Sequence, residues 1–233
     1  NCPLCRAKRP TSDKEMVKQL RPWLKKKKAW AQAHMGHAYR DGRGVKQSYE
    51  MAKKCFELAA QQGDVGSMYN LGDMYHKGEG VEQSYEKAKQ YYEQATQFGH
   101  ALAQNNLGCM YRDGNCGIQS YEKAKQLFEL ASQQGYDEAM LSLGTMYATA
   151  EGVEQDIVKA RELWRNAATQ GNKVAIDNLR QLDNEERQAA SLDPNATICS
   201  FCGLPETPTR NFGKTKCPCK STWYCDTACQ KKH

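Results

Sequence analysis

Apolar residues recur along most of the chain at the spacing of amphipathic helices. In one stretch Ala52, Cys55, Phe56 and Ala59 follow one another at i, i+3, i+4 and i+7. Residues at these spacings share one face of an α-helix, so the pattern predicts a helix with a single buried stripe. The same stripe returns 36 residues further on, and the equivalent residues there are Ala88, Tyr91, Tyr92 and Ala95.

Glycines keep the same step and mark an internal repeat. One set is Gly36, Gly72, Gly108 and Gly144, and a second set is Gly63, Gly99, Gly135 and Gly171. A period of this length is typical of stacked units that share one core, because a single unit cannot bury its own apolar face. The predicted units are 29–64, 65–100, 101–136 and 137–172, with a capping helix over 173–190.

Each unit is expected to hold two helices. In the first helix Leu71 and Tyr75 stand at i and i+4 with Gly72 beside them, and this glycine costs about 1 kcal/mol relative to alanine. Its recurrence in every unit predicts the close approach of a neighbouring helix. Helix N-caps are expected at Ser48, Ser84, Ser120 and Asp156, and the second glycine set is expected to end the second helices. Ala150 replaces a loop glycine in the fourth unit, and this is expected to alter the loop without affecting the stack.

The repeated pattern resembles the Sel-one-like repeat family, a relative of the tetratricopeptide repeats. The residues that carry the resemblance are Ala103, Leu107, Gly108, Tyr111, Lys123, Ala124, Phe128, Ala131 and Gly135. The resemblance implies an all-α fold, a right-handed α-solenoid whose concave surface is lined by the first helices and holds other proteins or peptides.

The candidate groove residues are those that vary between units on the first helix. His34, Asn70 and Asn106 share one position, and Asp73 stands at another. Asparagine side chains can hydrogen-bond an extended peptide backbone. The alternative is an ordinary solvated helix surface, and His34 in particular is expected to be exposed. Cys55 is expected to belong to the core.

Charge is distributed unevenly along the chain. Residues 1–28 carry ten Lys and Arg against two acids, residues 29–196 carry 17 against 23, and residues 197–233 carry six against two. Because phosphate binding needs a concentrated basic stripe, this argues against the solenoid as a nucleic-acid groove. Lys25 to Lys28 are interpreted as a solvated helix start or as a patch for an anionic surface. No stretch is apolar enough to span a membrane, and neither nucleic acid nor membrane is expected as a partner.

Six cysteines in the C-terminal segment 199–233 have the paired spacing of zinc ligands, after a linker at 191–198. The run from Lys220 to Gln230 resembles the MYND-type zinc finger. The resemblance implies one complete zinc site formed by Cys199, Cys202, Cys225 and Cys229, and a second site with Cys217 and Cys219 that is expected to be incomplete in this sequence. It also implies binding of proline-containing peptides, with Trp223, Tyr224 and Gln230 as contacts or as packing around the metal.

At the other end, Cys2 and Cys5 followed by Arg6 resemble the last zinc pair of a RING finger in segment 1–6, ahead of a basic linker or helix at 7–28. The resemblance implies contact of Arg6 with a ubiquitin-conjugating enzyme. The alternative is an unrelated pair of cysteines. The chain is expected to be a piece of a longer protein.

The residues favour a zinc-binding scaffold or adaptor for protein partners, placed in the cytoplasm or the nucleus. No catalytic residue is predicted, because none of the common hydrolase, metalloprotease or phosphate-loop motifs occurs. The alternative is the substrate-receptor part of a RING-type ubiquitin ligase, in which positioning replaces catalytic side chains.

Overall fold

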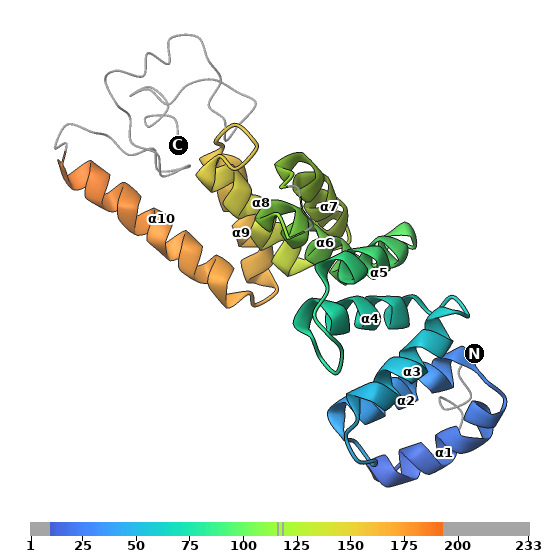
Figure 1. Cartoon of the computed structure of the whole chain (residues 1–233). Helices are drawn as coiled ribbons and strands as arrows, with labels where there is room; N and C mark the ends of the chain where they lie inside the picture. Colours follow the sequence, from blue (N-terminus) through green and yellow to red (C-terminus); the bar gives the residue numbers. More distant parts are fainter. Residues whose placement is uncertain (1–9, 116, 118, 193–233) are drawn as a thin grey trace. The chain divides into compact units, whose positions relative to one another are not determined.

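The computed structural model describes residues 10–115, 117 and 119–192, and the regular secondary structure in these ranges is entirely helical. The chain divides into two compact units, residues 1–134 and residues 135–233. The first unit contains α1 (Asp13–Lys25), α2 (Ala29–Asp41), α3 (Tyr49–Ala60), α4 (Val65–Lys77), α5 (Tyr85–Gln97), α6 (Ala101–Asp113) and α7 (Tyr121–Gln133) (Figure 1). The second contains α8 (Asp137–Thr149), α9 (Ile157–Thr169) and α10 (Lys173–Leu192).

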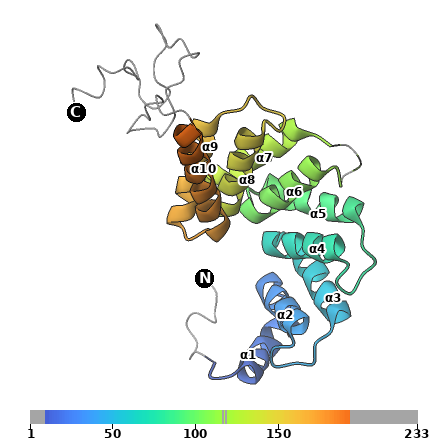
Figure 2. The same cartoon turned by 90° about the vertical axis from the view of Figure 1, so that its left-hand side faces the viewer.

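Successive helices of the first unit pack in order. α2 pairs with α3, α4 with α5, and α6 with α7, while α3 also packs on α4 and α5 on α6 (Figure 2). Each helix therefore packs its apolar stripe against the other helix of its pair, and the pairs in turn pack on one another. The predicted all-α solenoid of helix pairs is confirmed.

The glycines of the first helices permit the close approach that their recurrence predicts. Gly36, Gly72 and Gly108 lie against the rings of Phe56, Tyr92 and Phe128 from the second helix of the same repeat. A Cβ atom built on Gly72 would lie 2.6 Å from Cδ1 of Tyr92. Each ring is fully buried, so the glycine and the aromatic residue form the centre of each repeat.

The helix ends follow the sequence signals. The Ser48 side chain accepts a hydrogen bond from the Met51 amide at 3.2 Å, and Ser84, Ser120 and Asp156 cap their helices in the same way. The glycine Gly63 adopts a φ of 84° just after α3, as predicted.

Ala150 differs from its prediction. It adopts a φ of 60°, close to the values of 70°, 73° and 75° at the equivalent Gly42, Gly78 and Gly114. The substitution therefore leaves the backbone at this position unaltered. An L-residue in this left-handed region is strained by about 1–2 kcal/mol, which the packing of α8 and its loop has to offset.

A glutamine holds each loop to the end of the first helix, which the sequence did not reveal. Its side-chain amide donates to the carbonyl oxygen seven residues earlier at 2.7–2.9 Å, and the four glutamines are Gln47, Gln83, Gln119 and Gln155. These bonds satisfy carbonyl groups that the helix end leaves without an intrahelical partner.

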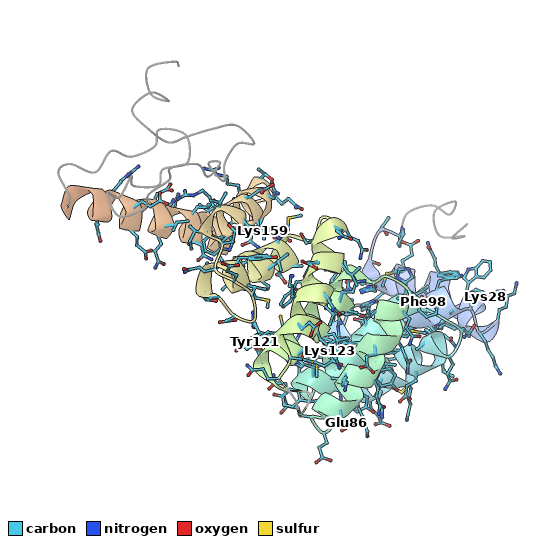
Figure 3. The ribbon with its side chains drawn as sticks, turned by 90° about the horizontal axis from the view of Figure 1, so that it is seen from above. Lys28, Glu86, Phe98, Tyr121, Lys123 and Lys159 are labelled. Atoms are coloured by element: carbon cyan, nitrogen blue, oxygen red, sulfur yellow. The ribbon has the colours of Figure 1, made fainter. Side chains whose placement is uncertain are left out.

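Tyrosines of the first helices link neighbouring repeats through cation–π contacts. Tyr75 lies between Lys53 of the preceding repeat and Lys87 of its own, at 5.8 and 5.1 Å from the ring centroid. Tyr111 lies in the same way between Lys89 and Lys123, the latter labelled in Figure 3. Each contact contributes about 0.5–1 kcal/mol at an exposed site.

α1 has the register of a second helix from one further, partial repeat. Its N-cap Ser12 stands 36 residues before Ser48, and Lys27, with a φ of 51°, stands 36 residues before Gly63. Leu20 of α1 is fully buried in a cluster with residues of α2. The Lys25–Lys28 run therefore joins two helices: Lys25 ends α1, and Lys28 is the N-cap of α2, so the run is exposed and only its last residue stands at a helix start.

In the second unit, the helix expected over 173–190 is α10, which packs on α9. Trp164 and Ala167 of α9 form an apolar cluster with Ala175 of α10. Arg161 of α9 donates to Asp183 and to Glu186 of α10, the latter at 2.6 Å. Only 8% of Arg161 is exposed, so these two ion pairs stabilise the packing of α10 on α9.

Candidate protein-binding pocket

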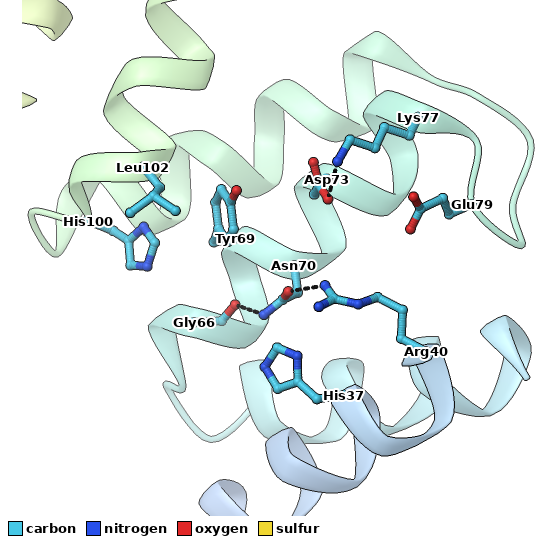
Figure 4. A pocket seen from close by; sticks show the side chains of 10 residues that line it. All are labelled: His37, Arg40, Gly66, Tyr69, Asn70, Asp73, Lys77, Glu79, His100 and Leu102. Carbon is cyan, nitrogen blue, oxygen red and sulfur yellow. Dashed lines mark hydrogen bonds and ion pairs between the residues drawn. The ribbon is translucent and has the colours of Figure 1, made fainter. Parts of the chain in front are cut away.

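First helices of successive repeats line an open pocket of about 460 Å³ in the first unit (Figure 4). α2 and α4 form most of its wall, and the start of α6 forms one end. The lining residues are His37, Arg40, Gly66, Tyr69, Asn70, Asp73, Lys77, Glu79, His100 and Leu102. The pocket thus lies on the helices whose surface was expected to hold partners.

Hydrogen bonds orient the Arg40 side chain in the wall of the pocket. Its Nη1 donates to Oδ1 of Asn70 at 2.8 Å, and its Nε donates to Asp41 at 3.1 Å. Asn70 in turn donates from Nδ2 to the Gly66 carbonyl at 2.6 Å. Burial alone would raise the pKa of Asp41, but the hydrogen bonds and charges of Arg40 and Arg43 outweigh it and lower that pKa. The guanidinium is therefore pre-oriented before any ligand arrives.

The second asparagine of the predicted groove behaves differently. Asn106 is half-buried and donates to the Tyr92 hydroxyl at 3.3 Å. The residue that corresponds to Tyr92 one repeat earlier is Phe56, which has no hydroxyl group. In Asn70 the Nδ2 group donates to the Gly66 carbonyl instead, and Oδ1 accepts from Arg40, whose equivalent in the next repeat is His76.

One end of the pocket is aromatic. The rings of Tyr69 and His100 stack with centroids 5.0 Å apart and an interplanar angle of 25°. His100 is also the N-cap of α6, and its Nδ1 accepts from the Ala103 amide at 3.3 Å. Because Nδ1 is the acceptor, the proton of the neutral imidazole is assigned to Nε2. Burial lowers the pKa of His100 and favours this neutral form.

The opposite end of the pocket carries charges of both signs. Asp73, 8% exposed, accepts from Nζ of Lys77 at 2.9 Å, and this hydrogen bond raises the pKa of Lys77. Burial, and then the Arg40 charge, lower the pKa of His37 and so favour its neutral form. The pocket therefore offers donors, acceptors and an aromatic surface, a combination suited to a peptide segment.

Three of the four predicted groove residues do not belong to an ordinary solvated helix surface, which was the alternative expectation. Asn70 and Asp73 are buried and line the pocket, whereas Asn106 bonds Tyr92 outside it. His34 is exposed, as predicted, and its ring lies 6.2 Å from that of Trp30. Cys55 is half-buried in the core cluster of α1 and α2, and burial raises the pKa of its thiol.

Sequence reasoning missed Arg40, Tyr69 and His100. A usable signal was present, because Tyr69 replaces Ala33, Asn105 or Leu141 of the other repeats. His100 likewise stands at the N-cap position that Asp64 fills one repeat earlier.

The predicted residues of the two terminal segments lie outside the described residues. They are Cys2, Cys5, Arg6, Cys199, Cys202, Cys217, Cys219, Trp223, Tyr224, Cys225, Cys229 and Gln230. Within residues 10–115, 117 and 119–192, no three His, Cys, Asp or Glu side chains are grouped closely enough to hold a metal ion. None of the helices in these ranges is long and apolar enough to cross a membrane.

Stacked helix pairs with glycine-centred packing and a pocket on the first helices define an α-helical repeat protein. The Sel1 repeat model matches residues 31–64, 65–100, 101–136 and 137–172, so the chain belongs to the Sel1 repeat family. Repeats of this family mediate protein–protein interactions. No curated protein is significantly similar to the chain in sequence.

Several solved structures share the fold. The protective antigen c5321 of uropathogenic Escherichia coli, which has an SLR fold, is 33% identical with a TM-score of 0.67, and the match covers 74% of this chain and 37% of c5321. A Sel1 repeat protein from Oxalobacter formigenes is 26% identical with a TM-score of 0.69, over 74% of this chain and 68% of that protein. The immunity protein Pa5087 of Pseudomonas aeruginosa is 22% identical with a TM-score of 0.51. The match covers 72% of this chain and 62% of Pa5087.

Proposed function

We propose that the chain is a protein-binding adaptor whose pocket on α2, α4 and α6 holds a segment of a partner protein. The observation that carries this proposal is the fixed Arg40 guanidinium, which Asp41 and Asn70 hold in place beside the stacked rings of Tyr69 and His100. A surface that is ordered before binding loses less conformational entropy when a ligand docks.

The pocket residues suit an extended peptide. Arg40 and the Nε2–H of His100 donate to backbone carbonyl or carboxylate oxygens, and Asp73 accepts from peptide amides. Tyr69 and Leu102 provide apolar contact for one side chain. Since the lining carries both charge signs, the pocket favours a mixed polar segment over a ligand with a single strong charge.

A peptide selection tests this site. A random peptide library is selected for binding to the full chain, and the affinity of the enriched peptides is measured for three variants. Arg40→Ala and Tyr69→Ala are expected to weaken binding about tenfold or more, as loss of a central contact does. Arg112→Ala, at the position equivalent to Arg40 two repeats later, is the matched control and should change little. Equal affinity for all variants would place the binding elsewhere.

The proposal extends to zinc in the terminal segments. It rests on the cysteine spacing alone, with Cys199, Cys202, Cys225 and Cys229 as one site of a MYND-type finger that takes proline-containing peptides. Zinc bound to these thiolates would stabilise the folded segment. Elemental analysis of the natural full-length protein tests the site: about two zinc ions per chain, reduced by Cys199→Ser, support one finger. Absence of zinc would exclude it.

The second candidate function, a RING-type ubiquitin ligase, is motivated by Cys2, Cys5 and Arg6. In this reading the repeats receive the substrate, and a cytoplasmic or nuclear ubiquitin-conjugating enzyme is a further partner. A transfer assay with the natural full-length protein distinguishes the two functions. Ubiquitin chains that depend on Cys5 support the ligase, whereas their absence leaves the adaptor.

A further inference from the structure

α1 carries a row of basic side chains along its outer face. Lys14, Lys18, Arg21 and Lys25 stand at i, i+4, i+7 and i+11, so they lie above one another on the helix. All four are exposed, whereas Val17 and Leu20 on the other side are buried against α2. The row spans about 16 Å along the axis, at 1.5 Å per residue. We call these four residues the basic row.

The basic row departs from the charge pattern of the other helices. In the second helices of the repeats, Lys53, Lys89 and Lys125 each form an ion pair with a glutamate four residues later, at 3.5–4.0 Å. In α1 the residue four positions after Lys14 is Lys18, and the one after Arg21 is Lys25. Among the described residues, no member of the basic row forms an ion pair.

This pattern has no structural explanation within α1. Like charges at i and i+4 destabilise a helix, and Lys14 stands in the first turn, where the helix dipole disfavours a cation. Only Lys25, in the last turn, is placed favourably. The nearby Glu15 is engaged by Thr11, whose amide and hydroxyl donate to it at 2.9 and 2.7 Å. A local rule broken without compensation is expected where a surface serves binding.

We propose that the basic row is a second docking surface, which binds an acidic α-helix of a partner protein. The partner helix would carry carboxylates at the same i, i+4, i+7 and i+11 spacing. Lys28, labelled in Figure 3, and its neighbours Lys26 and Lys27 extend the positive charge beyond the end of the row. The surface is separate from the pocket, so it does not depend on the pocket's function.

Three observations favour a protein helix over other anionic partners. The helices of the first unit lie side by side, and α1 itself packs on α2, so a further helix fits the way in which these elements pack (Figure 1). The row is straight and one residue wide, which matches a single stripe on a helix. A basic patch alone holds a bilayer only weakly unless an apolar face inserts as well, and the apolar face of α1 is packed on α2.

The test uses two helical peptides of identical composition and the full chain. One peptide has its glutamates in the stripe described above, and the other has them distributed around the helix. The striped peptide is expected to bind at least about five times more tightly in moderate salt. Lys18→Glu/Arg21→Glu should weaken its binding at least about tenfold. Lys46→Glu/Lys54→Glu makes the same charge change at exposed positions outside α1 and should change it less than about twofold.

Stability measurements separate binding from a structural role. Arg21→Glu creates a Glu–Lys pair with Lys25 at i and i+4, so the melting temperature should stay constant or rise while binding falls. A clear fall in melting temperature would overturn the proposal, as would equal binding of the two peptides or equal weakening by both double variants. Tighter binding to phosphatidylserine vesicles or to a short DNA duplex than to the striped peptide would also overturn it.

Discussion

At the scale of single residues, equivalent positions in successive repeats have different tasks. Asn70 and Asn106 align, yet one orients Arg40 and the other bonds Tyr92. Two substitutions accompany the difference: Phe56 stands where the next repeat has Tyr92, and Arg40 stands where it has His76. Alignment of the repeats identified the right helix surface, but only the three-dimensional contacts show which asparagine contributes to a pocket.

The glycines of α4 provide a matched pair for testing the packing at the repeat centre. Gly72→Ala should lower the free energy of unfolding by about 1–3 kcal/mol, because its new methyl group would overlap the buried Tyr92 ring. Gly66→Ala meets only Asp64 Oδ1, at 3.7 Å, and should raise the free energy of unfolding by up to about 1 kcal/mol through helix propensity. Urea unfolding of both variants checks this, and similar effects of the two changes would refute the packing explanation.

Ala150 is a site where glycine should stabilise the protein. Ala150→Gly removes the strain of a left-handed backbone and is expected to add about 1 kcal/mol to the free energy of unfolding. The reverse change, Gly78→Ala, should subtract a similar amount, because its Cβ atom meets nothing closer than 3.4 Å and only the backbone is affected. Thermal unfolding of the two variants measures both. A loss of stability in Ala150→Gly, or a gain in Gly78→Ala, would contradict the assignment of strain.

His100 should make stability depend on pH. Burial lowers its pKa in the folded chain, so the folded state binds fewer protons than the unfolded state below the ordinary value of about 6.5. Its contribution is therefore present above about pH 6.5 and is lost as the pH falls through the lowered pKa. Protonation of Nδ1 also removes the cap of α6.

The control for this prediction is His100→Asn, which keeps a good N-cap without a titrating ring. Below about pH 6.5 the wild-type chain should lose free energy of unfolding relative to the variant, measured by denaturant unfolding at several pH values. His37 titrates in both proteins, so the difference isolates His100. Parallel pH profiles would show that His100 contributes nothing.

At the scale of helices, the repeated elements could be predicted from the sequence. The glycine spacing and the serine caps follow from local chemistry, and the structure confirms them in α3, α5 and α7. α1 was expected only as a basic linker or helix because its own signals diverge from the repeat. Leu20 replaces the aromatic residue, and Lys27 takes the left-handed position of a glycine. Only the backbone conformation makes the shared register evident.

The packing of α10 on α9 depends on the buried ion pair between Arg161 and Glu186. Arg161→Ala should lower the free energy of unfolding by about 3 kcal/mol, because Glu186, whose side chain is 13% exposed, then loses its partner. Hydrogen exchange in α10 should accelerate. Arg180→Ala, which lies in α10 itself, is the control. The ion pair of Arg180 with Asp177 is largely exposed and contributes less than about 1 kcal/mol. Unchanged exchange in the Arg161 variant would show that apolar packing alone holds α10.

At the scale of the whole molecule, this account gives the chain more than one weak site for partners. The pocket on α2, α4 and α6 and the basic row on α1 belong to the same unit, and the cysteine-rich segments are further candidates. Sites on one chain raise the effective concentration of a partner that engages two of them. Modest affinity at each site is therefore compatible with a stable complex.

Hydrogen exchange of the full chain with a library-selected peptide bound tests the central claim most directly. The account predicts slower exchange at the ends of α2, in α4 and at the start of α6, and loss of this protection in the Arg40→Ala variant. Slower exchange only in residues 135–233, or the same protection in wild type and variant, would contradict the pocket as the binding site.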